Sequence, residues 1–273
     1  MREFYLVNQN GESYYFSYRN NTLATDITGL GFDKDIVYLK YDTEYKKAKE
    51  NTPLGSINMK LIFLEGYKGY ASFLKYLKRS KELNLYYKSD DLKFCNIEIK
   101  SLSKEELVAG TIQSSIHIDR LSLWQKQKLY NMNIEKFDDN KSYPFKYPYT
   151  YSQSNRGTLT VSNEGSEKAS LRIEIEGAVN NPELIITKDD KVLSRLRLYV
   201  VNSKCSIVVD SNVRNQIMTL KDSKGTKSIY ENQDFEQDNF LFVDPGTYDL
   251  EFKPGVTTNT TCKIILTEFY LGN

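Results

Sequence analysis

The chain has 273 residues, which is enough for two domains of ordinary size. Its 37 lysines and arginines stand against 36 acidic residues, so the net charge of +1 predicts neither nucleic acid nor anionic lipid as a partner. The 21 tyrosines and 13 phenylalanines, against a single tryptophan, favour pleated, half-buried surfaces, and we expect a mainly β protein.

No stretch of the sequence approaches the roughly 18 apolar residues of a membrane span, and residues 1–10 lack the apolar core of a signal peptide. We therefore expect a protein that is made without export and has no membrane partner. Cys95, Cys205 and Cys262 are an odd number of cysteines at wide spacing inside strand-like runs. This pattern predicts buried, reduced thiols rather than a disulfide framework or a metal site.

The first half of the chain begins with a predicted hairpin over residues 4–18, closed by the polar turn at 8–11. Residues 57–65 alternate like a half-buried strand, and residues 69–80 then change to the period of an amphipathic helix. The residues that we expect on the apolar face of this helix are Tyr70, Phe73, Leu74 and Leu77.

Between the hairpin and the helix lies a long polar segment, Tyr38–Pro53, which lacks a clean period. Such a segment inside a compact domain is usually functional or an extended arm, because nothing else offsets the entropy of ordering it. Later strands are expected at 83–87, 94–102 and 111–119. His117, the single histidine, falls on the polar face of the last of these, which predicts a surface histidine rather than a ligand or a base.

A change in composition marks a predicted domain boundary. Pro144 and Pro148 lie close together among aromatic residues, and proline disfavours both a helix and a central strand. We predict a first domain over residues 1–142 and a second over residues 143–273.

The second domain contains the clearest strand pattern of the chain, in Ser170–Lys188. Apolar and charged residues alternate from Leu171 to Glu176, so one face of this strand needs a second sheet to cover it. Gly177 to Pro182 should break the strand before it resumes at Leu184. Repeated short strands with turns between them predict a β-sandwich.

The motifs of common enzymes are missing from the sequence: there is no nucleophile elbow, phosphate-binding loop or dinucleotide fingerprint, and no cysteine and histidine spacing for zinc. We therefore predict no enzyme, no catalytic residues, no metal ligands and no cofactor. A hydrolase with dispersed carboxylates stays open, because acidic residues far apart in sequence can meet in a fold.

The order of elements resembles the distal tail protein (Dit) family of long-tailed bacteriophages. In the first domain the resemblance is carried by the strand at 57–65 and by the segments GYASFLKYLKRS, LNLYY and SLSKEELVAGTIQSSIHIDRLSLW. The second domain is similar to the galectin-like sandwich of that family, carried by Gly157–Val161 and by the segments IEGAVNNPELII and FLFVDPGTYDLEF.

The resemblance implies a structural hub at the tip or baseplate of the tail, located in the virion and assembled in the bacterial host cytoplasm. The implied partners are other copies of the chain in a hexameric ring, the tail tube protein, a tail-associated lysin or tail-fibre hub protein, and a receptor-binding protein. One ring or two back-to-back rings both stay open. A ring would also give the Tyr38–Pro53 arm a neighbouring subunit to lie on.

The alternative is a carbohydrate-binding protein that acts through the second domain. Galectins use a constellation that includes His and Trp, but His117 and Trp124 both precede the predicted boundary. Tyr199, Tyr230 and Tyr270 could replace them as stacking platforms, although core or interface packing is the commoner use of tyrosines in strands. We therefore expect no galectin-type sugar binding.

Overall fold

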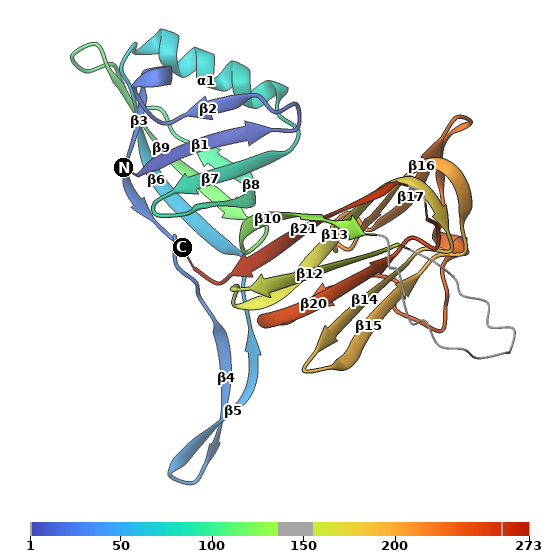
Figure 1. Ribbon diagram of the computed structural model, residues 1–273. Helices are drawn as coiled ribbons and strands as arrows, with labels where there is room; N and C mark the ends of the chain where they lie inside the picture. Colours follow the sequence, from blue (N-terminus) through green and yellow to red (C-terminus); the bar gives the residue numbers. More distant parts are fainter. Residues whose placement is uncertain (1, 136–154, 258, 273) are drawn as a thin grey trace, which may run out of the picture. The chain divides into compact units, whose positions relative to one another are not determined.

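The computed structural model describes residues 2–135, 155–257 and 259–272, which divide into two compact units (Figure 1). Unit 1 comprises Met1–Lys126 with Tyr270–Asn273, and unit 2 comprises Gln127–Phe269. The prediction of a mainly β fold is confirmed. The predicted linker at Pro144 and Pro148 lies outside the described residues, so the division after residue 142 stays a prediction; by their contacts, residues 127–135 group with unit 2.

Unit 1 is built on one run of antiparallel strands in the order β2-β1-β7-β8-β9-β6-β3. Its elements are β1 (Glu3–Asn8), β2 (Ser13–Tyr15), the 3-10 turn η1 (Tyr18–Asn20), β3 (Thr22–Thr28), β4 (Asp35–Tyr41), β5 (Glu44–Asn51), β6 (Gly55–Phe63), α1 (Tyr67–Arg79), β7 (Leu83–Lys88), β8 (Leu92–Leu102), β9 (Ile112–Arg120) and the start of β10 (Trp124–Met132). The alternation of buried and outward residues along β6 and β9 follows the predicted pattern.

Helix α1 is confirmed, but its buried face differs from the predicted one. Leu74 is 42% exposed, whereas Gly69, Phe73 and Tyr76 are buried. The helix packs on the strands through rings: Phe73 and Tyr76 lie 4.9 and 5.4 Å from the ring of Tyr14. Gly69 faces Phe63, where an added Cβ would lie 3.4 Å from the Phe63 Cβ.

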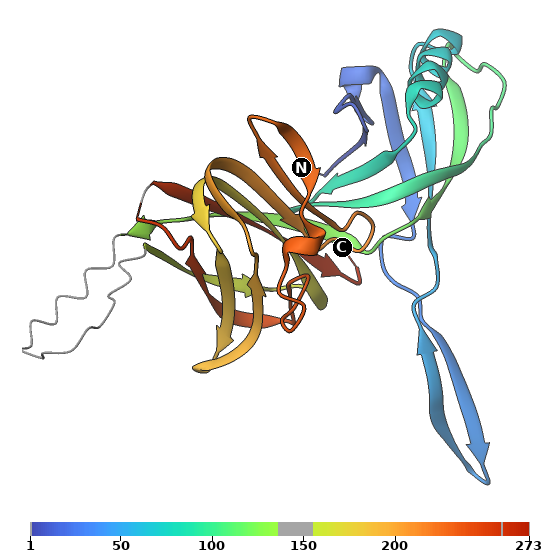
Figure 2. The ribbon, with the colours of Figure 1, turned by 90° about the vertical axis from the view of Figure 1, so that its right-hand side faces the viewer.

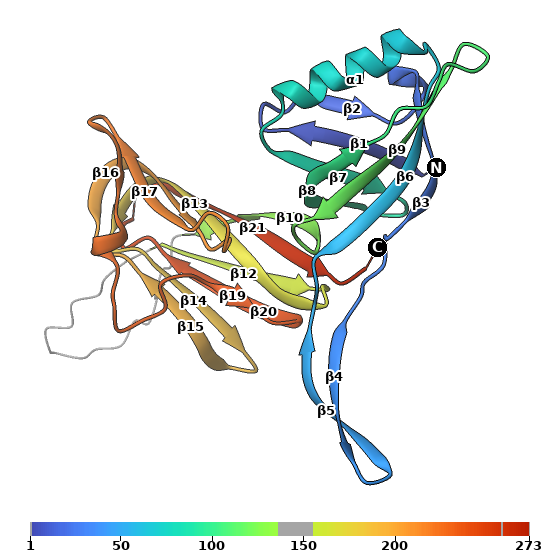
Figure 3. The ribbon, with the colours of Figure 1, turned by 180° about the vertical axis from the view of Figure 1, so that it is seen from behind.

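Unit 2 is a β-sandwich whose two sheets share one apolar core (Figure 3). One sheet runs β18-β17-β16-β13-β21-β10, with β19 beside β13, and the other runs β11-β12-β20-β14-β15. The elements are β11 (Ile134–Glu135), β12 (Arg156–Asn163), β13 (Glu167–Asn180), β14 (Glu183–Lys188), β15 (Lys191–Arg197), β16 (Val201–Asp210), β17 (Ile217–Asp222), β18 (Gly225–Ser228), the 3-10 turn η2 (Tyr230–Asn232), β19 (Phe242–Val243), β20 (Gly246–Lys253) and β21 (Thr260–Tyr270). The predicted covering sheet is thus present.

The predicted break at Gly177 is wrong in one respect. Strand β13 continues to Asn180, and the corner comes at Asn181, whose φ is 52°. Gly177 instead marks a bulge: Gly177 pairs with Cys205 and Val179 with Asn202, so Ala178 stands opposite two residues of β16. A glycine inside a strand supplies the backbone freedom that such an irregularity needs.

Candidate assembly surfaces

The most exposed element of unit 1 is a ribbon of two strands, β4 and β5, which we call the arm. The two strands form a sheet of their own, paired from Asp35↔Asn51 to Tyr41↔Glu44. Figure 2 shows the arm extending from the body of unit 1 as a long twisted hairpin. The sequence predicted an arm over Tyr38–Pro53; in the structure the arm begins earlier, at Asp35, and ends at Asn51.

Both faces of the arm carry exposed apolar groups. One β4 row consists of Val37, Leu39 and Tyr41, which are 51%, 49% and 57% exposed. Tyr38 and Tyr45 project from the other face and are 54% and 68% exposed. An isolated two-stranded hairpin is marginally stable in water, and this one buries little apolar surface within its own unit. The arm therefore has the character of a segment that is completed by a partner.

The root of the arm is held by two buried side chains from the end of the first unit. Arg120 donates from Nη1 to the carbonyl oxygen of Gly31 at 2.9 Å, and Trp124 donates from Nε1 to that of Leu30 at 3.0 Å. Gly55, at the start of β6, lies against the Arg120 guanidinium: a Cβ atom added to Gly55 would be 2.7 Å from Arg120 Nε. The body of unit 1 thus fixes the direction in which the arm leaves it.

Glu50 forms a second clamp at the base of the arm. Its carboxylate accepts hydrogen bonds from the ammonium groups of Lys34 and Lys47. These bonds, first that from Lys34 and then that from Lys47, lower the pKa of Glu50 from 4.5 to about 2. The clamp ties the connection before β4 to strand β5.

A row of stacked rings crosses four neighbouring strands of unit 1 on its outer face. Tyr15, Tyr5, Tyr86 and Phe94 follow one another at centroid distances of 4.8, 4.9 and 5.1 Å, and Arg19 lies 4.1 Å over Tyr15. Because the faces of the rings cover one another, the row presents ring edges and no flat platform. Sequence reasoning missed this row, although the neighbouring aromatic pairs Phe4-Tyr5, Tyr14-Tyr15 and Tyr86-Tyr87 place one ring on each face of their strands and would have pointed to it.

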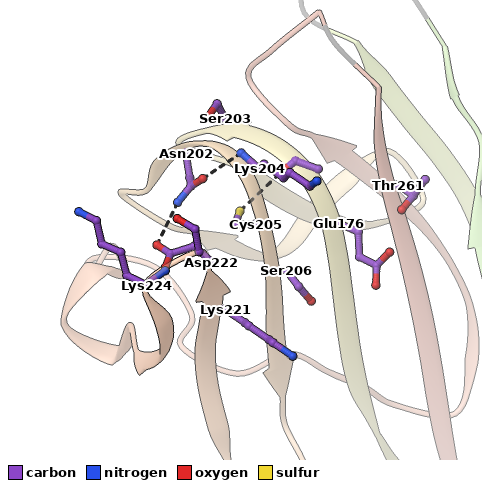
Figure 4. Close-up of a pocket in the computed structure, with 12 residues that line it drawn as sticks. Glu176, Asn202, Ser203, Lys204, Cys205, Ser206, Lys221, Asp222, Lys224 and Thr261 are labelled. Atoms are coloured by element: carbon purple, nitrogen blue, oxygen red, sulfur yellow. Dashed lines mark hydrogen bonds between the residues drawn. The ribbon is translucent and has the colours of Figure 1, made fainter.

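In unit 2, an open groove of about 1040 Å³ lies beside the bulge in the pairing of β13 with β16 (Figure 4). Most of the residues that line it carry a polar or charged group: Glu176, Gly177, Asn202, Ser203, Lys204, Cys205, Ser206, Lys221, Asp222, Ser223, Lys224 and Thr261. The sequence reasoning missed this groove, because it interpreted Gly177 as the end of a strand, whereas β13 continues past Gly177 and faces a bulge of β16.

The tyrosines considered as sugar platforms are already engaged. Tyr199 donates from its hydroxyl to Asp234 Oδ2 at 3.0 Å, and the Arg197 guanidinium lies 5.4 Å over its ring. Tyr230 packs edge-on against Phe235 at 6.1 Å. Tyr270 belongs to unit 1, where Lys93 covers its ring at 4.4 Å. The three do not form one platform.

His117 and the three cysteines occupy the places that the sequence predicted, whereas no place had been predicted for Trp124. His117 is exposed on β9, and Trp124 is fully buried. All three cysteines are buried and unpaired with one another, and burial raises the pKa of the Cys95 and Cys262 thiols to about 12. Across residues 2–135, 155–257 and 259–272, no group of three or more His, Cys, Asp or Glu side chains could hold a metal ion, and no helix has the length and apolar character of a membrane span.

Comparison with known proteins relates unit 1 to a family. Residues 3–121, the body of unit 1 with its arm, match the family model for the distal tail protein, N-terminal domain. Unit 1 carries a distal tail protein domain. The resemblance to this family is therefore confirmed, and the prediction of a structural protein rather than an enzyme agrees with it. No curated protein matches the chain.

Solved structures extend the likeness over both units. A chain of the phage P2 baseplate in its activated conformation with calcium is 14% identical, with a TM-score of 0.67 and complete coverage of both chains. The crystal structure of the SPP1 Dit protein, described as a paradigm of the hub adsorption apparatus in phages that infect Gram-positive bacteria, is 11% identical, with a TM-score of 0.62 over 97% of this chain and 98% of that one. At such identities the likeness concerns the fold, which the distal tail protein domain shares with these chains.

Proposed function

We propose that this chain is a structural component of a long-tailed phage tail tip or baseplate. In this proposal, copies of unit 1 form a hexameric ring that continues the tail tube, and unit 2 is a bracket that holds adsorption proteins. The distal tail protein domain and the fold shared with the P2 baseplate chain and SPP1 Dit support the tail location. The site of action is the virion, after assembly in the host cytoplasm.

The exposed arm is the structural feature that best supports a ring. Its exposed row of Val37, Leu39 and Tyr41 has no covering surface in unit 1. Covering such side chains stabilises an assembly by roughly 25 cal/mol per Å² of apolar surface removed from water. An arm that leaves one subunit and lies on the next makes a head-to-tail contact, and a contact of this kind closes into a ring when the rotation allows it.

The proposed partners follow from this arrangement. One face of the ring meets the tail tube protein, and the opposite face meets a tail-associated lysin or tail-fibre hub protein; a receptor-binding protein attaches to the bracket. Native mass measurement of the purified chain tests the ring directly. The expected species is a hexamer or a pair of hexamers, whereas a chain that stays monomeric at high concentration and gives no six-fold density in tails contradicts the proposal.

A test of the arm's role in assembly needs a variant in which unit 1 stays folded. Asp35 and Asn51 are cross-strand partners, so replacing residues 35–51 by a short Gly-Ser linker joins ends that already lie together. A milder variant changes Val37, Leu39 and Tyr41 to Ser. Its control changes Val192 and Leu193 to Ser; these two residues lie on β15 of unit 2 and are 55% and 56% exposed. We expect both arm variants, and not the control, to give folded monomers.

A further inference from the structure

The groove at the bulge of unit 2 collects positive charge that the rest of the unit does not neutralise. Within the described residues, Lys204, Lys221 and Lys224 make no ion pair. Figure 4 shows Lys204 above the floor of the groove and Lys221 extending along it, while Lys224 stands at the rim beyond Asp222. The surrounding groups are short hydroxyls, which can donate or accept hydrogen bonds.

One of the two acidic groups of the groove is already occupied. Asp222 accepts from the backbone nitrogen of Lys224 at 2.7 Å and from Asn202 Nδ2 at 3.4 Å, and Asn202 Oδ1 accepts from the backbone nitrogen of Lys204 at 2.9 Å. These bonds hold the two walls of the groove in place. Glu176 is the remaining carboxylate, and it is exposed on the floor.

The bulge creates the shape that holds these charges. Because Ser203 and Lys204 together stand opposite Ala178, the pairing of β13 and β16 is irregular at this point, although Asn202 and Val201 still pair with Val179 and Asn180. Figure 4 shows the Lys204 side chain over the sheet at this irregularity. Bulges recur where a strand must re-aim a side chain, and here the re-aimed group is an ammonium. The groove is open along the sheet face, so it admits an extended chain.

We propose that this groove is a docking site for an acidic, extended segment of a partner protein, whose carboxylates pair with Lys204 and Lys221. The complementarity is one of charge, in a chain whose overall net charge is only +1. This inference rests on the proposed function in one respect: that the partner is another protein of the phage tail. Its test needs no ring, so failure of the groove and failure of the ring are separate results.

The test uses a fluorescently labelled, end-capped hexaglutamate peptide, titrated against the full chain at low salt and followed by anisotropy, with hexaglutamine as the neutral control. We expect saturable binding of hexaglutamate alone, weakening as salt rises. Lys204→Glu with Lys221→Glu should weaken it by about tenfold, since each change replaces an attraction by a repulsion. Glu176→Gln should strengthen it by about twofold, because it removes a like charge from the floor.

The matched control is Lys191→Glu, an exposed lysine on the β14–β15 hairpin that likewise makes no ion pair within the described residues. It should leave hexaglutamate binding within twofold of the unchanged chain. Equal weakening by Lys191→Glu would show non-specific attraction and overturn the proposal. Absence of saturable hexaglutamate binding, or saturable binding of inorganic pyrophosphate without any of the peptide, would overturn it as well.

Discussion

A Cβ atom on Gly29 would lie 1.9 Å from the carbonyl oxygen of Ser56, so the connection after β3 touches the start of β6 backbone to backbone. Gly29 also has a φ of +83°, a backbone angle that residues with a side chain rarely adopt. Gly29→Ala should therefore destabilise unit 1 far more than Gly11→Ala, since Gly11 has a similar φ of +78° but open space around its Cβ position.

We expect the two variants to differ by about 2 kcal/mol or more in unfolding free energy. Urea unfolding followed by the fluorescence of Trp124, the sole tryptophan and a member of unit 1, measures the difference. Equal destabilisation would mean that the close approach at Ser56 relaxes without cost.

Arg120→Met tests the root from its other side. The variant keeps a long apolar stem beside Gly55 but loses the bond to the Gly31 carbonyl. We expect unit 1 to stay folded while amide exchange accelerates in residues 29–34, because their anchor is lost. Arg79→Met serves as the control, since that guanidinium is exposed and lies 3.9 Å from Glu12. Unchanged exchange near Gly31 would assign the anchoring to Trp124 alone.

The Glu50 clamp should make the base of the arm sensitive to acid. Its folded pKa is depressed from 4.5 to about 2, so the stabilisation is present above the ordinary value and is lost as the pH falls through the interval between the two. Amide exchange of residues 34–36 and 49–51, corrected for its intrinsic pH dependence, should rise across that interval. Glu50→Gln should show the loosened state at neutral pH, and Glu44→Gln, at the exposed end of the arm, should not.

Proteolysis between Tyr143 and Tyr149 tests how the two units divide the chain. The sequence predicts cleavage there, because proline-bearing connections are poor parts of regular structure. Residues 127–135 group with unit 2. A cut between residues 143 and 149 therefore leaves them on the N-terminal fragment, while most of unit 2 is on the C-terminal fragment. We expect the two fragments to co-elute until denaturant is added. Two pieces that separate and fold independently would favour the boundary after residue 142.

Unit 2 should not bind sugars in the manner of a galectin. Its candidate platform Tyr199 is committed to Asp234 and covered by Arg197, and Tyr230 packs on Phe235. Titration of the chain with galactosides and with host-wall saccharides should show no saturable binding below millimolar concentration. A micromolar isotherm that Tyr199→Ala or Tyr230→Ala abolishes would support the lectin alternative instead.

Alternation within a strand was the part of the fold that the sequence predicted well. Leu171 and Ile175 point into the core because the period of two fixes the face of each residue once one face is buried. The buried face of helix α1 was less predictable. Tyr76 is buried there instead of Leu74, because Tyr76 packs against Tyr14, which is distant in the sequence. Such a choice depends on tertiary packing and leaves no mark in the spacing.

The surfaces were harder to predict for a related reason. The arm lacks a period because both of its faces meet solvent in the single chain, so no pattern of burial shaped its sequence. The groove depends on one residue of β13 standing opposite two of β16, and pairing register between strands is not written in either strand alone. Arg120 could not be linked to Gly31, because 89 residues separate them.

The arm also sets a condition on the life of the chain before assembly. A ribbon with two open edges is a template for uncontrolled strand addition between molecules, and the β4 row of Val37, Leu39 and Tyr41 would favour it. Lys46 and Lys49 lie on strand β5 and make no ion pair within the described residues, so their like charges on two approaching copies repel each other. In the proposed ring, these lysines would disfavour strand addition between free copies until each arm meets the neighbouring subunit.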